Sequence, residues 1–124
     1  MVLYGRREKK AVPNVYKTCT ELEAKTWNFI SRINGHPYEA APIGTSALIR
    51  YLKKEKPDVV HLQCINGFFV NIYRLVEYLK QHQIPTVLTL HAEFMFTGGC
   101  SHALDCEQWS DAKGCNSESC PGYG

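Results

Sequence analysis

The sequence predicts an α/β fold, in which a partial Rossmann-like parallel sheet with flanking helices is followed by a Cys-rich irregular C-terminal segment. Two short runs rich in β-branched residues, 58–62 and 86–90, have the composition of strands. The stretch between them has helical periodicity, so the unit of about 30 residues fits a right-handed strand–helix–strand crossover. Beyond these elements, Gly, Ser, Asp and Cys dominate. We therefore expect residues 1–97 to form a Rossmann-like α/β portion and residues 98–124 to form a Cys-rich loop segment of the same domain.

The first element is a short strand. Val2–Tyr4 is an apolar run that Gly5 ends. The following stretch, 6–18, is polar and contains Pro13, which disfavours regular structure. It is therefore predicted to be a loop.

A helix is predicted to follow this loop. Thr20 and Glu23 have the spacing of a capping box, and Asn34-Gly35 is a typical C-terminal signal. Four apolar residues at helical spacing predict the face that packs inward: Leu22, Phe29, Ile30 and Ile33.

A second helix is predicted to begin with a cap at Thr45 or Ser46 and to stop before Pro57. Its expected inward residues are Leu48, Ile49 and Leu52.

The crossover helix has the strongest amphipathic pattern. Its apolar residues recur at intervals of three and four, and Ile84-Pro85 ends it. The next strand, 86–90, is apolar enough to predict cover on both faces. His61, within the preceding strand, is expected in the core. The helix pattern comprises Phe69, Ile72, Leu75, Val76 and Leu79.

Composition excludes several classes of protein. The 14 basic and 12 acidic residues give a net charge of +2, without the basic field of a nucleic-acid-binding protein. No apolar run approaches the ~18 residues that span a bilayer. Six cysteines without a secretory signal layout indicate a reducing compartment. We therefore expect a cytoplasmic protein that binds no nucleic acid.

Polar side chains follow both central strands. Asn66 and Gly67 come after the first, and His91 and Glu93 after the second. Ligands of open parallel sheets bind beyond the carboxyl ends of the strands. Histidine there suits a substrate contact or acid–base chemistry, although a bond to a loop carbonyl would explain it equally. The glycine-rich phosphate loops of dinucleotide and Walker-type sites are absent from the sequence.

The run from Lys56 to Trp109 resembles the N-terminal domain of family-4 glycosyltransferases of GT-B architecture, especially bacterial enzymes of polysaccharide assembly. The likeness rests on KPDVVHLQCINGFFVNIYRLVEYLKQHQIPTVLTLHAEFMFTGGC and on the later CEQW and GCNSESCP. It covers about half of the chain. The residues 63, 64, 66, 92 and 99 depart from the polar residues usual in that family.

The resemblance implies retaining transfer of a sugar from a nucleotide-sugar donor to a glycan or lipid-linked acceptor, with no cofactor for catalysis. It implies that the donor binds a C-terminal domain absent here, so we expect an inactive fragment of a longer enzyme, cytoplasmic or peripheral at the inner face of the membrane. His91 would be the catalytic residue at the cleft. The substrate-binding residues would be Asn66, Gly67, Glu93, Thr97 and Gly98.

Four late cysteines, separated by five, eight and four residues, raise the hypothesis of a structural zinc site. Disulfides or free thiols would explain them equally. The ligands would be Cys100, Cys106, Cys115 and Cys120, with His102 as a substitute.

Two other functional classes stay open from the sequence. One is a small zinc-stapled binding or interaction module, and the other is a different nucleotide-handling α/β domain. Exposed strand edges of a truncated sheet also lead us to expect a homodimer.

Overall fold

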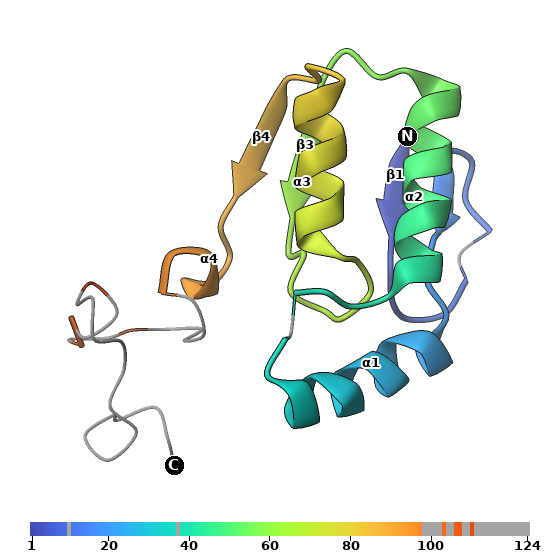
Figure 1. Ribbon diagram of the computed structural model, residues 1–124. Helices are drawn as coiled ribbons and strands as arrows, with labels where there is room; N and C mark the ends of the chain where they lie inside the picture. Colours follow the sequence, from blue (N-terminus) through green and yellow to red (C-terminus); the bar gives the residue numbers. More distant parts are fainter. Residues whose placement is uncertain (10, 37, 98–102, 104–105, 108–109, 111–124) are drawn as a thin grey trace. The chain divides into compact units, whose positions relative to one another are not determined.

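The computed structural model describes residues 1–9, 11–36, 38–97, 103, 106, 107 and 110 (Figure 1). The chain divides into two units, Met1–Leu88 and Thr89–Gly124, which are treated separately below. The elements in chain order are β1 (Val2–Tyr4), β2 (Val15–Lys17), α1 (Glu21–Asn34), α2 (Pro42–Glu55), β3 (Val60–Gln63), α3 (Ile72–Gln81), β4 (Thr86–Thr89) and α4 (Phe94–Thr97).

The described residues confirm a mixed α/β fold, with strands in two two-stranded sheets. β1 and β2 are parallel, with Val2 opposite Val15. β3 lies beside β4, and the two arrows run in the same direction in Figure 1. The prediction of a loop over 6–18 was therefore wrong at β2. A three-residue strand is too short to show a pattern, and its conformation depends on the edge that β1 offers it.

Helix α1 begins and ends as predicted. The Thr20 hydroxyl accepts a hydrogen bond from the Glu23 amide at 3.1 Å. At the other end, Gly35 adopts a left-handed φ of 71° and donates its N–H to the Ser31 carbonyl. This conformation is one that glycine adopts without a steric penalty.

The predicted inward face of α1 was wrong. Leu22, Phe29 and Ile33 are 77%, 67% and 73% exposed. The buried residues of the helix are Ala24 and Ser31. Ala24 belongs to a buried cluster with Cys19, Ala40 and Ala41, against which Trp27 packs. The small side chain of Ala24 lets α1 lie close to the backbone of these residues.

Helix α2 begins earlier than predicted. Pro42 occupies its first turn, where a missing N–H carries no penalty. Thr45, predicted as a cap, lies inside the helix: its hydroxyl donates to the Ala41 carbonyl and accepts from the Asn71 amide, both at 2.7 Å. Ile49 and Leu52 are buried as predicted.

The β3–α3–β4 unit lies where the sequence predicted it. Ile72, Leu75 and Leu79 of α3 are buried, whereas Val76 is 46% exposed. The Asn71 side chain caps α3 by accepting the Arg74 amide at 2.9 Å. Together with Thr45, this residue ties the start of α3 to α2.

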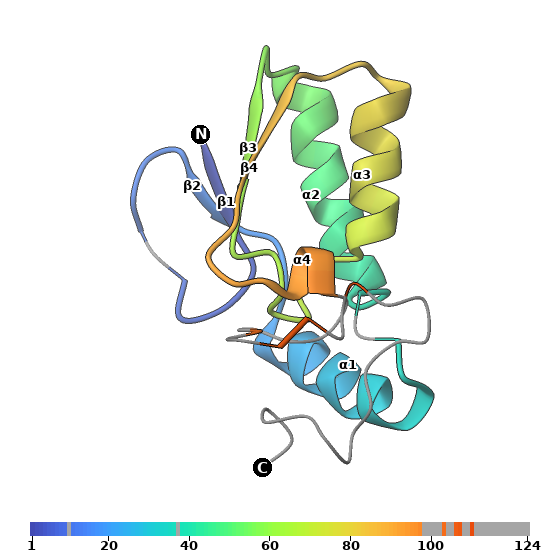
Figure 2. The same cartoon turned by 90° about the vertical axis from the view of Figure 1, so that its left-hand side faces the viewer.

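Helices α2 and α3 cover one and the same face of the strands (Figure 2). Two expectations of burial in the strands were nevertheless wrong. β4 is exposed along its whole length, with Val87 52% and Leu88 41% exposed. His61 is also exposed, and its Nδ1 lies 3.3 Å from the Gln63 amide nitrogen.

The second unit contains α4. Phe94 is buried, and the Cys106 amide donates to the Ala103 carbonyl at 2.8 Å. In the part of the chain that the structure describes, no helix has the length and apolar character needed to cross a bilayer.

Candidate functional site: the carboxyl-end rim of the first unit

The loop after β3 forms one wall of a rim at the carboxyl ends of β1 and β3. Ile65 is buried and anchors the loop, whereas Asn66 is exposed and Gly67 is half-buried. Cys64 and Phe68 adopt positive φ angles of 46° and 56°. Such angles strain residues other than glycine, and strain of this kind is frequent in loops that bind ligands.

Phe69 fills the space between the two strand ends. A Cβ added to Gly5 would lie 1.9 Å from Cγ of Phe69, and one added to Gly67 would lie 2.7 Å from Cδ1. Both glycines are therefore required by packing, because either side chain would collide with the ring. The sequence pattern assigned Phe69 to the crossover helix. A glycine after each of the strands β1 and β3 was the signal that could have revealed an inserted ring.

Arg6 supplies a positive charge at the same rim. Its Cδ lies 3.5 Å from the position of a Cβ on Gly67, and its Nε lies 3.5 Å from Oε2 of Glu21. The backbone amide of Arg7, followed by the charges of Arg6 and Lys17, holds the pKa of Glu21 below its usual value of 4.5. The side chain of Arg6 thus lies next to Gly67 and pairs with the carboxylate of Glu21.

The N-terminus of α2 is occupied by a carboxylate of the protein itself. Glu23 accepts hydrogen bonds from the amides of Ile43 at 2.9 Å and Gly44 at 3.1 Å. These amides are the groups that bind phosphate in many α/β proteins. Because Glu23 neutralises them, this helix end does not offer an open anion site. Glu23, rather than completing the capping box of α1, joins the two helices.

Cys19 lies beside this carboxylate and is 2% exposed. Its Sγ donates to Oε2 of Glu23 at 3.4 Å. Burial, followed by the negative charge of Glu23, raises the pKa of the Cys19 thiol to about 12. The thiol is therefore protonated at neutral pH and is not a nucleophile.

The other predicted site residues lie in the second unit. His91 is exposed. The half-buried Glu93 carboxylate accepts the amide of Ala103, and the Glu93 carbonyl accepts the amide of Thr97 at 3.0 Å. Glu93 therefore stabilises its own segment. Gly98 lies outside the described residues.

The zinc hypothesis falls mostly outside the described residues. Cys100, Cys115, Cys120 and His102 belong to the part that is not described, and Cys106 is half-buried. Within the described part, no group of three or more His, Cys, Asp and Glu side chains could hold a metal ion. The zinc site stays a prediction.

The structure thus brings together Gly67, Gly5, Arg6 and Phe69, with Asn66 on the same loop. An exposed amide after β3 and a guanidinium after β1 can bind hydroxyl or anionic oxygen atoms. Sequence reasoning identified Asn66 and Gly67 but missed Arg6 and Phe69, because only the fold brings these two residues next to Gly67. Compared with protein-family models, curated proteins and solved structures, the chain gives no match.

Proposed function

We propose that this chain is the acceptor-side portion of a retaining glycosyltransferase. The observation that carries the proposal is the position of the polar residues after the central strands: Asn66 and Gly67 follow β3, and His91 follows β4. Two further facts support it. The run from Lys56 to Trp109 resembles family-4 enzymes, and β3, α3 and β4 occupy the residues at which that resemblance requires a strand, a helix and a strand.

In the proposed reaction, an acceptor hydroxyl forms a bond to the anomeric carbon of the donor sugar as the bond to the nucleoside diphosphate breaks. The hydroxyl proton leaves with the departing phosphate. His91 contacts the donor sugar or orients the acceptor hydroxyl, and Asn66 binds sugar hydroxyls through its amide. Positive charge that stabilises the leaving diphosphate comes from a nucleotide-binding domain outside this sequence.

The test is sugar transfer by the enzyme that contains both domains, assayed with a panel of nucleotide-sugars and a lipid-linked acceptor. We expect His91→Ala to lower turnover at least tenfold, which corresponds to about 1.4 kcal/mol of activation free energy. His36→Ala is the matched control. The side chain of His36 is 60% exposed and pairs with Glu39, and neither residue belongs to the segments that follow β3 and β4.

Circular dichroism of each variant checks that it folds. Equal turnover of folded His91→Ala and wild type would remove His91 from the mechanism. An absence of transfer from every donor in the panel would count against the glycosyltransferase itself.

A further inference from the structure

The segment after β1 carries more positive charge than its carboxylates balance. Residues 6–9 contain three basic side chains and one acidic side chain, and the neighbouring β2 contributes Lys17. The Nζ of Lys17 donates a hydrogen bond to the Arg7 carbonyl at 2.5 Å and lies 3.7 Å from Oε1 of Glu21. Arg6 pairs with the same carboxylate. Two cations therefore share Glu21, and a net positive charge remains beside the end of β1.

The ion pair with Glu21 uses only part of the binding capacity of Arg6. Nε of Arg6 lies 3.5 Å from Oε2 of Glu21, and 43% of the Arg6 side chain is exposed. Within the described part of the chain, no other side chain forms an ion pair or a hydrogen bond with this guanidinium. A guanidinium has five N–H donors in a planar fork, so donors remain for an oxyanion from solution.

The loop after β3 places a polar amide at the same rim. Cδ of Arg6 lies 3.5 Å from the position that a Cβ on Gly67 would take, so the Arg6 side chain packs against this glycine. Asn66 precedes Gly67 in the chain, about 3.8 Å away from Cα to Cα, and is exposed. Its side-chain amide both donates and accepts hydrogen bonds, which suits hydroxyl groups.

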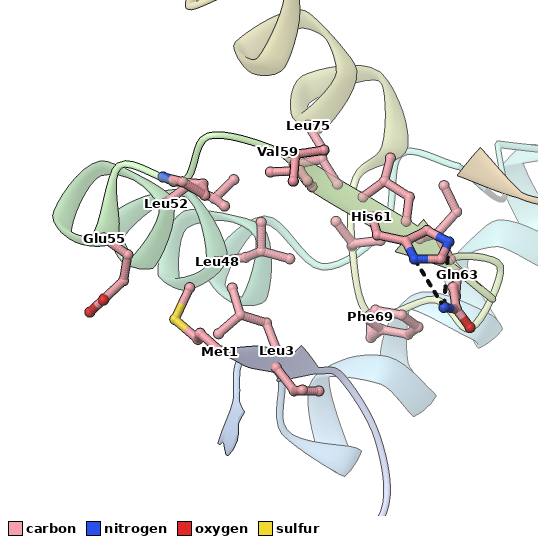
Figure 3. Close-up of a pocket in the computed structure, with 16 residues that line it drawn as sticks. Met1, Leu3, Leu48, Leu52, Glu55, Val59, His61, Gln63, Phe69 and Leu75 are labelled. Atoms are coloured by element: carbon pink, nitrogen blue, oxygen red, sulfur yellow. Dashed lines mark hydrogen bonds between the residues drawn. The ribbon is translucent and has the colours of Figure 1, made fainter. Parts of the chain in front are cut away.

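The groove behind this rim is unsuited to a charged ligand. It lies between β1 and β3 and has a volume of about 720 Å³ (Figure 3). Most of the side chains that line it are aliphatic, and an anion without a partner is costly to bury among them. The ring of Phe69 lines the groove and also meets Gly5 and Gly67, so it lies between the groove and the rim. An anion is therefore bound more favourably at Arg6 than in the groove.

We propose that the rim binds an anionic sugar. A carboxylate or phosphate of the sugar makes a two-point contact with the guanidinium of Arg6, and a hydroxyl of the same sugar bonds to the amide of Asn66. A uronic acid and a sugar phosphate share this chemistry, whereas a neutral sugar lacks the group that Arg6 recognises. That this sugar is the acceptor rests on the proposed function, but the binding itself does not.

Titration of the chain with sugars, followed by the amide NMR signals of Arg7 and Gly67, measures the binding. We expect methyl glucuronide, or glucose phosphorylated at its primary hydroxyl, to bind at least about tenfold more tightly than the neutral methyl glucoside. The tighter of the two charged probes identifies the source of the anion. Equal binding of charged and neutral sugars, or no binding of either charged sugar, would overturn the proposal. Tighter binding of inorganic phosphate or uridine diphosphate than of both charged sugars would also overturn it.

Substitution of Arg6 separates a specific contact from general attraction. Arg6→Gln removes one positive charge, and Lys9→Gln is the matched control because it removes the same charge from an exposed residue of the same segment. We expect Arg6→Gln to weaken binding of the charged sugar about tenfold and Lys9→Gln to change it less than about twofold. Arg6→Lys keeps the charge without the planar fork and should give an intermediate affinity. Equal losses in Arg6→Gln and Lys9→Gln would overturn the proposal.

Substitution of Asn66 tests the contact with the hydroxyl. Asn66→Ala should weaken binding of the charged sugar about fivefold and leave the affinity for inorganic phosphate unchanged. Unchanged affinity of this variant for the charged sugar would show that the rim recognises an anion and not a sugar, which would overturn the proposal. Urea midpoints verify that each variant folds, and the exposed ion pair of Arg6 contributes little to stability.

Sugar transfer separates this inference from the proposed function. In the enzyme that contains both domains, Arg6→Gln should raise KM for the anionic acceptor about tenfold and leave kcat unchanged, because Arg6 contacts the acceptor before and during the reaction alike. Transfer with an unchanged KM would overturn the anionic acceptor site and leave the glycosyltransferase function intact. Binding of the charged sugar to this chain, without transfer by the enzyme that contains both domains, would instead refute the proposed function and retain the binding site.

Discussion

Removal of the Glu23 carboxylate should destabilise the first unit more than removal of any exposed carboxylate. Glu23 accepts the amides of Ile43 at 2.9 Å and Gly44 at 3.1 Å from its position on α1. It therefore satisfies two of the free N–H groups at the start of α2 and places a negative charge at the positive end of the helix dipole.

The expected magnitude follows from these contacts. Hydrogen bonds to a charged group contribute about 1.5–3 kcal/mol each when they are shielded from water. Glu23 is half-buried, so its two bonds and the dipole term together amount to about 2–3 kcal/mol. Glu23→Gln keeps an oxygen acceptor and loses the charge, so its effect should be about 1 kcal/mol.

Urea denaturation followed by tryptophan fluorescence measures the effect, because Trp27 packs against the cluster that contains Cys19. We expect Glu23→Ala to lower the midpoint by about 1–2 M urea. Glu77→Ala on α3 is the matched control: its carboxylate is exposed and accepts only from Gln81, at 3.1 Å, among the described residues. Equal midpoints for Glu23→Ala and Glu77→Ala would refute the role of this carboxylate.

Three further predictions follow from the same contacts. The pKa of Glu21 lies below its usual value of 4.5, so its ionised form stabilises the fold above that pH. The difference in urea midpoint between wild type and Glu21→Gln should therefore vanish as the pH falls below 4.5. A difference that persists at pH 2 contradicts this. Iodoacetamide should modify the exposed Cys64 before the buried Cys19, since raising a thiol pKa from 9.0 to about 12 lowers the thiolate fraction about a thousandfold. Labelling of Cys19 before Cys64, followed by mass spectrometry of peptides, would contradict this. Gly5→Ala should destabilise by more than about 2 kcal/mol, and Phe69→Ala should remove most of that penalty in the double variant; additive effects would show that the two residues do not collide.

Strong local signals in the sequence predicted their elements correctly. The capping residue Thr20 and the terminal Gly35 define the ends of α1, and both make the predicted backbone contacts. The crossover helix was also predicted, because apolar residues at a regular interval form one face wherever the helix packs. Such signals act within a few residues of the chain, so they do not depend on the rest of the fold.

Local signals failed where packing partners decide the outcome. The apolar stripe that contains Leu22 and Phe29 is a regular pattern, yet the buried residues of α1 are Ala24 and Ser31. The small side chain of Ala24 fits into a cluster with Ala40 and Ala41. The pattern of β4 predicted cover on both faces, but all four of its residues are exposed. Hydrophobicity indicates what can be buried, and only the arrangement of elements decides what is buried.

The same distinction between local signals and tertiary packing applies to the candidate site. The sequence by itself determined that Asn66 and Gly67 follow a strand, because chain order fixes which residues come after each element. Only the tertiary structure showed that Phe69 lies between Gly5 and Gly67, that Glu23 occupies the N-terminus of α2, and that a groove separates β1 from β3. These contacts join residues up to 64 positions apart in the chain. Their energies come from steric fit and electrostatics at short range in space, for which a single sequence carries no local pattern.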